Sequence, residues 1–217
     1  MKTLQALGAL LTYPTADLVD ALPDIHALIV EEGALDKDQR NRLKGLMLWM
    51  TGQELLDLEE AYVDLFDRGR ATSLHLFEHV HGESRDRGQA MVDLKALYQR
   101  AGLELRGNEL PDYLPAVLEY LSLRPVAEVK EMIVDCAHIL RALGQQLVKR
   151  RSRYAAVIDA VLVLAGEAGV GAGEAAETPK EKSMDEEWAE EPVIFGPAAA
   201  PCSSQPGQRK QPPAARM

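Results

Sequence analysis

The fold is decided by residues 125–151, which read PVAEVKEMIVDCAHILRALGQQLVKRR. Apolar side chains recur there at alternating steps of three and four residues, which is typical of an amphipathic α-helix. A proline opens the segment, and the basic run at its end suits the negative end of a helix dipole. We therefore predict one long helix, with an apolar stripe made of Val126, Val129, Ile133, Cys136, Leu140, Leu143 and Leu147.

The same periodicity extends over the rest of residues 1–166. Pro14, Gly33 and Gly52 are helix-ending signals, and Asp36 is a good N-cap. No segment of this part alternates in the manner of a half-buried strand. We therefore predict an all-α fold, a single bundle-like domain of eight or nine helices at 1–166. Its further helices are expected at 3–12, 17–32 with a restart at Pro23, 36–50, 53–66, 73–81, 87–101, 112–123 and 154–165.

Charge and cysteine content exclude several classes of function. The 217 residues include 34 acids and 24 bases, a formal net charge of −10. Such a surface repels phosphate backbones and anionic lipid, which argues against binding to nucleic acid or to a membrane surface. Only two cysteines occur, so no disulfide framework or CxxC ligand pair is present, which favours a reducing compartment. No secretory signal and no apolar run of about 20 residues is visible, so a membrane-inserted protein is not expected.

The last fifty residues differ in composition from the rest of the chain. Seven of the 12 prolines lie beyond Gly166, among many Gly, Ala and Glu residues. We predict that 167–217 is a mostly disordered acidic, Pro/Ala-rich tail, so its removal from 171 onward should leave the helical domain folded. Within it, 188–195 (WAEEPVIF) joins aromatic and β-branched residues to acids. This cluster is either a chance grouping or a linear motif that docks on its own domain, in the client groove, or on a partner.

Three of the five histidines lie in residues 73–88. His75, Glu78 and His79 fit the H-x-x-E-H pattern of some zinc peptidases. On one helix the two imidazoles would lie a turn apart and could hold zinc while Glu78 orients a water, with Glu83 or Glu104 as a third ligand. A zinc-dependent hydrolase is therefore one hypothesis. In the alternative, these histidines simply form hydrogen bonds at a polar helix–loop junction.

Two neighbouring motifs carry a resemblance to a known family. Residues 62–69 (YVDLFDRG), followed closely by 75–91 (HLFEHVHGESRDRGQAM), resemble the signature of the nitrate reductase molybdenum cofactor assembly chaperones, the NarJ-type delta subunits. Residues 10–14 (LLTYP) and 188–193 (WAEEPV) are similar to that family too. Its wider relatives are the all-helical redox-enzyme maturation chaperones, which bind twin-arginine leader peptides. No E-P-x-D-H-type loop of those relatives occurs in 1–166.

The resemblance implies a cytoplasmic, non-enzymatic chaperone without a cofactor of its own. Such chaperones bind the catalytic alpha subunit of respiratory nitrate reductase, including its N-terminal segment. They keep it open until the molybdenum cofactor and an iron–sulfur cluster are inserted, and they delay its docking to the membrane subunit. They are absent from the final enzyme complex.

A basic, amphipathic client segment needs an apolar groove with acidic edges. We place that groove where the helix ending at Phe66 meets residues 75–87. Tyr62 and Phe66 would form its floor, or alternatively would pack in the core beside Leu55 and Leu58. The histidines would make affinity depend on pH, and the arginines would hold neighbouring acids in place. The candidate client-binding residues are Tyr62, Asp64, Phe66, Asp67, His75, Glu78, His79, His81, Glu83, Arg85 and Arg87.

Overall fold

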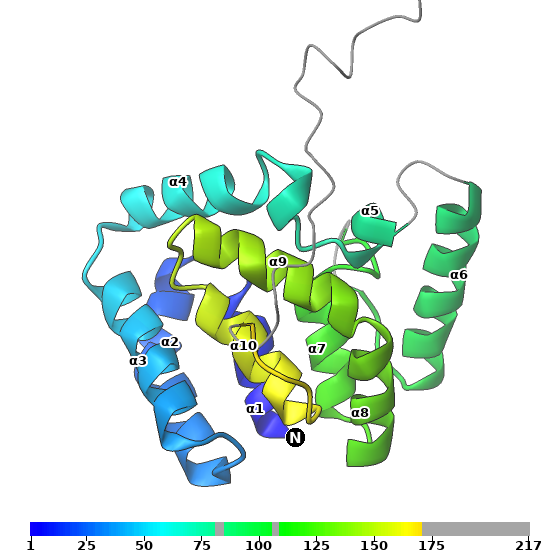
Figure 1. The fold of residues 1–217 in the computed structure, drawn as a ribbon, viewed down its shortest axis with the longest axis horizontal. Coiled ribbons are helices and arrows are strands. Elements are labelled where there is room, and N and C mark those ends of the chain that lie inside the picture. The colour runs from blue at the N-terminus through cyan, green and yellow to red at the C-terminus, as the bar shows by residue number, and fades with distance from the viewer. Residues whose placement is uncertain (81–84, 106–108, 171–217) are drawn as a thin grey trace, which may run out of the picture. The chain divides into compact units, whose positions relative to one another are not determined.

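The computed structural model describes residues 1–80, 85–105 and 109–170. These ranges contain ten α-helices and one short 3-10 helix, and no strand occurs in them. The all-α prediction is confirmed (Figure 1). The elements are α1 (Lys2–Leu10), α2 (Ala16–Glu32), α3 (Lys37–Thr51), α4 (Leu55–Phe66), η1 (Arg70–Thr72), α5 (Leu76–Val80), α6 (Arg85–Arg100), α7 (Leu114–Ser122), α8 (Val126–Asp135), α9 (Ala137–Lys149) and α10 (Ala155–Leu164). None of the described helices has the length and apolar content that crossing a bilayer requires.

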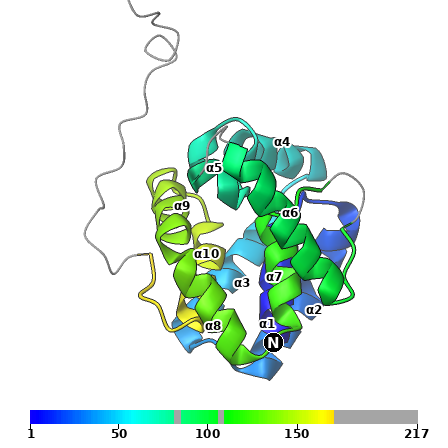
Figure 2. The ribbon, with the colours of Figure 1, turned by 90° about the vertical axis from the view of Figure 1, so that its right-hand side faces the viewer.

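The N-terminal helix α1 lies in the middle of the packing. It contacts α7, α2 and α10, and Leu4, Leu7 and Leu10 on it are fully buried. A Cβ at Gly8 would lie 3.2 Å from the backbone oxygen of Pro115, so the missing side chain lets α1 and α7 approach closely. In contrast, α6 lies at the edge of the described structure, next to α7 (Figures 1 and 2), where the rings of Tyr98 and Tyr120 have centroids 5.1 Å apart.

The segment that decides the fold is two helices, so the prediction of one long helix was wrong. The break falls at Cys136, whose φ of −100° and ψ of 7° lie outside the helical region. The apolar stripe is nevertheless largely buried on both sides of it, with Val129 and Ile133 on α8 and Leu140 on α9. The break raises the number of helices to ten. The predicted restart at Pro23 was also wrong, because α2 runs through that residue without interruption.

The described chain ends in a short segment that packs back on α9 and α10. The N–H of Val170 donates to Oδ1 of Asp159 at 2.9 Å, and Oδ2 of the same buried carboxylate accepts from Arg42 on α3 at 2.7 Å. The Val170 side chain is buried, above Gly144 of α9. The expected domain boundary at 166 stays a prediction, but these contacts show that packing in the described chain continues to Val170.

The contact between Val170 and Gly144 predicts that a larger residue at position 144 lowers the stability measurably. A Cβ at Gly144 would lie 2.5 Å from Cγ2 of Val170, so Gly144→Ala must displace that side chain. We expect the free energy of unfolding to fall by about 1–2 kcal/mol, as for other overpacked sites. Urea denaturation measures the change. In a Val170→Ala background the same substitution should cost much less, since the obstructing methyl is gone; an equal cost there would contradict the packing argument.

Candidate functional site

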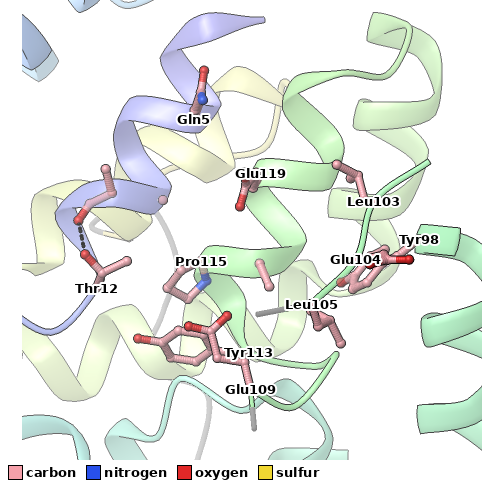
Figure 3. Close-up of a pocket in the computed structure, with 13 residues that line it drawn as sticks. Gln5, Thr12, Tyr98, Leu103, Glu104, Leu105, Glu109, Tyr113, Pro115 and Glu119 are labelled. Atoms are coloured by element: carbon pink, nitrogen blue, oxygen red, sulfur yellow. Dashed lines mark hydrogen bonds between the residues drawn. The ribbon is translucent and has the colours of Figure 1, made fainter. Parts of the chain in front are cut away.

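A groove runs between α1 and α7. Its third side is the chain segment that follows α6 (Figure 3). It encloses a cavity of about 470 Å³. The residues that line it are Gln5, Gly8, Ala9, Thr12, Tyr98, Leu103, Glu104, Leu105, Glu109, Tyr113, Pro115, Ala116 and Glu119. The small residues of α1 and α7 leave room at the bottom, so the close helix approach at Gly8 also shapes this floor.

Three glutamates edge this cavity. Glu119 projects from α7 toward α1, while Glu104 and Glu109 come from the segment between α6 and α7 (Figure 3). All three are exposed, and none forms an ion pair with another of the described residues. Among the described residues that line this cavity, none carries a basic side chain. As far as the described residues go, the cavity therefore combines an apolar floor with negatively charged edges.

The cavity continues toward η1 and α5 through shared residues. Glu109 and Tyr113 also line a second cavity of about 480 Å³, together with His75 and Leu110. His75 in turn lines a further cavity of about 370 Å³, with Phe66, Asp67, Gly69, Arg70, Ser73 and Glu78. We call these three cavities, which share lining residues, the acidic groove. Its far end adds Asp67 and Glu78, with Arg70 and His75 as the basic groups.

Residues far apart in sequence hold the middle of the groove together. His75 and Tyr113 form an antiparallel β-bridge, in which Leu114 N–H donates to Leu74 O at 2.9 Å and Leu76 N–H to Asp112 O at 3.1 Å. The Asp112 side chain is fully buried. Its Oδ2 accepts from the N–H of Phe77 at 3.1 Å, and its Oδ1 lies 3.2 Å from Nδ1 of His75. This carboxylate ties the start of α5 to the start of α7.

The same carboxylate changes the protonation of His75. The hydrogen bond to Asp112 raises the pKa of His75 above its ordinary value of 6.5, against the opposing effect of burial. The nearby charges of Glu78 and Arg87 act in opposite directions on it. The groove therefore contains an imidazole that stays protonated to a higher pH than a free one.

Tyr62 and Phe66 lie in the core, with 4% of each residue exposed. The Tyr62 hydroxyl donates to Leu11 O at 2.8 Å and lies 3.0 Å from the Tyr113 hydroxyl. Their rings pack against Tyr154. The two side chains also line a small cavity of about 180 Å³ beside His75. Packing is thus their evident role, and a contact with a client stays a prediction.

The other predicted residues lie at varied places. Asp67, His75 and Glu78 meet at the far end of the acidic groove. Asp64 is exposed and pairs with Arg68 at 2.8 Å. Glu78 also pairs with Arg87 of α6 at 3.5 Å. His79 makes a hydrogen bond from Nε2 to Ser73 O at 2.9 Å. His81, Glu83 and the side chain of Arg85 lie outside the described residues.

The zinc-hydrolase hypothesis finds no support. His75 precedes α5, which begins at Leu76 and not at Ser73 as predicted, so His75 and His79 do not share a helix. Each imidazole already has a partner, Asp112 for His75 and Ser73 O for His79. In the described ranges no three His, Cys, Asp or Glu side chains come together as a metal site would require. The hydrogen-bonding alternative describes these two histidines.

The α1–α7 part of the groove was not predicted from the sequence. Glu104 was considered only as a possible zinc ligand, and Glu109, Tyr113 and Glu119 were not among the predicted binding residues. A usable signal exists, since residues 102–119 hold four acids and a single base. The contact of this stretch with small residues of α1, however, joins segments about a hundred positions apart.

The fold is similar to that of a solved structure. It resembles the crystal structure of a chain from Archaeoglobus fulgidus assigned to the redox enzyme maturation proteins, with a TM-score of 0.52 and 21% identity. The match covers 73% of this chain and 88% of that chain, and at this identity it establishes the fold alone.

The family follows from sequence. Residues 32–159 match the model of the nitrate reductase delta subunit, and the chain belongs to this family. It is 43% identical over 202 residues to the nitrate reductase molybdenum cofactor assembly chaperone NarJ of Escherichia coli K12, covering 90% of this chain and 85% of that protein. NarW of the same strain, assigned the same role, is 41% identical over 215 residues, covering 95% and 89%. These relatives are named chaperones and not catalysts, so the resemblance and the non-enzymatic class are confirmed.

Proposed function

We propose that the chain is a nitrate reductase molybdenum cofactor assembly chaperone that acts in the cytoplasm. Its client is the catalytic alpha subunit of nitrate reductase, bound at least through the N-terminal segment of that subunit. Binding keeps the subunit open for insertion of the molybdenum cofactor and an iron–sulfur cluster before it docks at the membrane. The chaperone then leaves and is not part of the final enzyme. Membership of the delta subunit family supports the role.

The acidic groove is the observation that supports the proposal of client binding. An amphipathic segment in such a groove lays its apolar face on the floor and its polar face toward the edges. Here the floor offers Ala9, Leu103, Leu105 and Ala116, and the edges offer carboxylates without partners among the described residues. Basic side chains flanking an apolar face would pair with Glu104, Glu109 and Glu119. The charge of the edges speeds association and rejects acidic segments.

The proposal predicts direct binding of a synthetic peptide with the sequence of the client's N-terminus. Calorimetry on the full chain should show a saturable 1:1 complex whose affinity falls with added salt. A peptide of the same composition in scrambled order is the control, since it keeps the charge and loses the apolar face. Binding of both peptides alike would contradict recognition of an amphipathic segment.

Co-purification from cells growing on nitrate without oxygen should recover the alpha subunit. Its absence would contradict the proposal that the alpha subunit is the client.

Client affinity should rise with pH. Protonated His75 places a positive charge in the wall of a groove that receives a basic segment, and Asp112, Glu78 and Arg87 surround it. Because the pKa of His75 is raised, this charge persists above pH 6.5 and is lost as the pH rises through the folded-state value. At about 4 Å in water one like charge costs about 1 kcal/mol, so the Kd should fall about fivefold on its loss.

Calorimetric titrations from acid to mildly alkaline pH measure this dependence. His75→Gln should give a flat profile, because an uncharged side chain stays at the same place. The matched variant His79→Gln should keep the dependence, because His79 is not among the residues that line the acidic groove. A fall in affinity with rising pH would contradict the predicted direction of the pH dependence.

A further inference from the structure

We propose that the exposed face of the α2–α3 helix pair binds a second copy of this chain, so that two chains form a weak symmetric dimer. This surface, here called the hairpin face, surrounds a cavity of about 210 Å³ between the two helices. The described residues that line this cavity are distinct from those that line the acidic groove. The proposal therefore does not depend on the identity of the client. The tail motif at 188–195 lies outside the described residues and has no part in it.

The cavity of the hairpin face is apolar and has an exposed leucine at its rim. Leu22 of α2, 2% exposed, and Met47 of α3, 4% exposed, form its floor. Leu48 of α3 borders it and is 62% exposed. A single exposed leucine is ordinary on a protein surface. Here, however, an exposed apolar side chain lies next to an apolar hollow, and Pro23 extends the apolar rim on α2. A surface with both features fits a copy of itself.

The two helices of the hairpin face carry opposite charges. The exposed acids of α2 recur at helical spacing and are Asp17, Asp20, Asp24 and Glu31. The basic residues at helical spacing on the side of α3 that lines the cavity are Lys37, Arg40 and Lys44. None of these side chains forms an ion pair with another described residue. The hairpin face is thus acidic along one helix and basic along the other, which favours a partner with the same two stripes in the opposite order.

These charges select one symmetric arrangement. Most dimers of identical chains have a two-fold axis, so that each contact between two residues occurs twice. An axis that runs along the hairpin lays α2 of one chain over α3 of the other, and acids then face bases. An axis across the hairpin lays α2 over the α2 of the partner, where like charges oppose the contact. The first arrangement is therefore the one that the hairpin face favours.

The shared cavity indicates which residues meet. Pro23 of α2 and Lys44 and Leu48 of α3 line the same cavity, so they lie at the same level along the hairpin. A two-fold axis along the hairpin keeps this level. Asp24, which follows Pro23, therefore comes within reach of the partner's Lys44. Leu48 meets the partner's cavity on the side of the partner's Pro23.

The size of the hairpin face predicts weak association. With its 17 residues α2 is about 25 Å long, and two helices side by side are about 20 Å wide. The dimer would therefore bury about 500 Å² on each chain, or about 1,000 Å² in total, which is less than the roughly 1,200–2,000 Å² of stable interfaces. We expect a Kd of about 10–100 µM, so the chain is mostly monomeric when dilute.

Sedimentation velocity of the full-length chain measures this association. Between about 1 and 500 µM, a range that brackets the expected Kd, the average mass should rise from 23.9 kDa toward twice that value. Leu48→Ser should raise the Kd at least about tenfold, because the leucine no longer fills the partner's cavity. Leu48 is exposed, so the fold should be unaffected, and circular dichroism checks this. A mass that stays at 23.9 kDa over the whole range would overturn the proposal.

An exchange of charges between chains tests the arrangement itself. Asp24→Lys alone, or Lys44→Glu alone, places like charges at both copies of the contact, so each variant should stay monomeric where the wild type dimerises. An equimolar mixture of the two variants should dimerise again, because both contacts then join opposite charges. The matched variants Asp135→Lys and Lys130→Glu on α8 are also exposed and should each dimerise like the wild type. Dimers of either hairpin variant alone, no recovery on mixing, or an equal loss in the α8 variants would overturn the proposal.

Discussion

Asp112→Ala is expected to lower the free energy of unfolding by about 3 kcal/mol. The carboxylate is fully buried and serves two donors, the N–H of Phe77 and Nδ1 of His75. Its removal leaves the Phe77 N–H without this acceptor and the raised pKa of His75 without its main cause. It also weakens the tie between the start of α5 and the start of α7. Urea denaturation followed by circular dichroism measures the loss.

The pH dependence separates the two bonds of Asp112. The pKa of His75 is raised in the folded state, so its stabilising contact is complete below about pH 6.5 and is lost as the pH rises through the folded-state value. The difference in unfolding free energy between the wild type and Asp112→Asn should therefore be larger at pH 6 than at pH 9. A difference that does not change with pH would show that His75 contributes nothing, and that only the Phe77 bond stabilises this junction.

The helix ends that local residues determine could be predicted from the sequence. Asp36 caps α3 with its side chain, and Gln39 completes a capping box. Gly33 ends α2 with a φ of +64°. In each case the deciding residue and its partner lie within four positions, so the sequence pattern contains the whole interaction.

The break at Cys136 could not be predicted in the same way. No glycine or proline marks it, and the apolar stripe keeps its phase across it. Val129 and Ile133 before the break and Leu140 after it are all buried. Periodicity therefore indicates which side of a helix faces the core, but not whether the helix axis continues in one direction. The direction of α9 depends on its packing against α10, a contact that local sequence does not contain.

The candidate site was predicted only at its far end. Asp67, His75 and Glu78 do meet in one cavity, because they lie within twelve residues of each other. His75 lies outside α5, since pairing with Tyr113, 38 residues later, holds it in a β-bridge. The three glutamates of the α1–α7 cavity are likewise brought together by tertiary packing alone. Charge counting along 102–119 finds the acids, and only the fold shows the floor that they border.

The largest effect on binding is expected from reversing the charge of those glutamates. Glu104→Lys, Glu109→Lys and Glu119→Lys together should weaken binding of the basic client peptide about 100-fold, or about 3 kcal/mol. Each substitution removes an attraction at the groove edge and adds a repulsion. The three side chains are exposed, so the fold should be unaffected. Calorimetry gives the affinity, and the salt dependence seen with the wild type should disappear or reverse.

A matched variant decides whether the groove or the net charge of the chain is responsible for the affinity for the client peptide. Glu31→Lys, Glu54→Lys and Glu131→Lys change the net charge by the same amount, and these exposed glutamates do not line the acidic groove. This variant should keep most of the affinity, because charges beyond about 10 Å are screened at ~0.1 M salt. If this variant loses as much affinity as the groove variant, the attraction comes from the net charge of the chain and the groove does not select the client. If neither variant loses affinity, the peptide binds on another face of the molecule, even where the chaperone role itself holds.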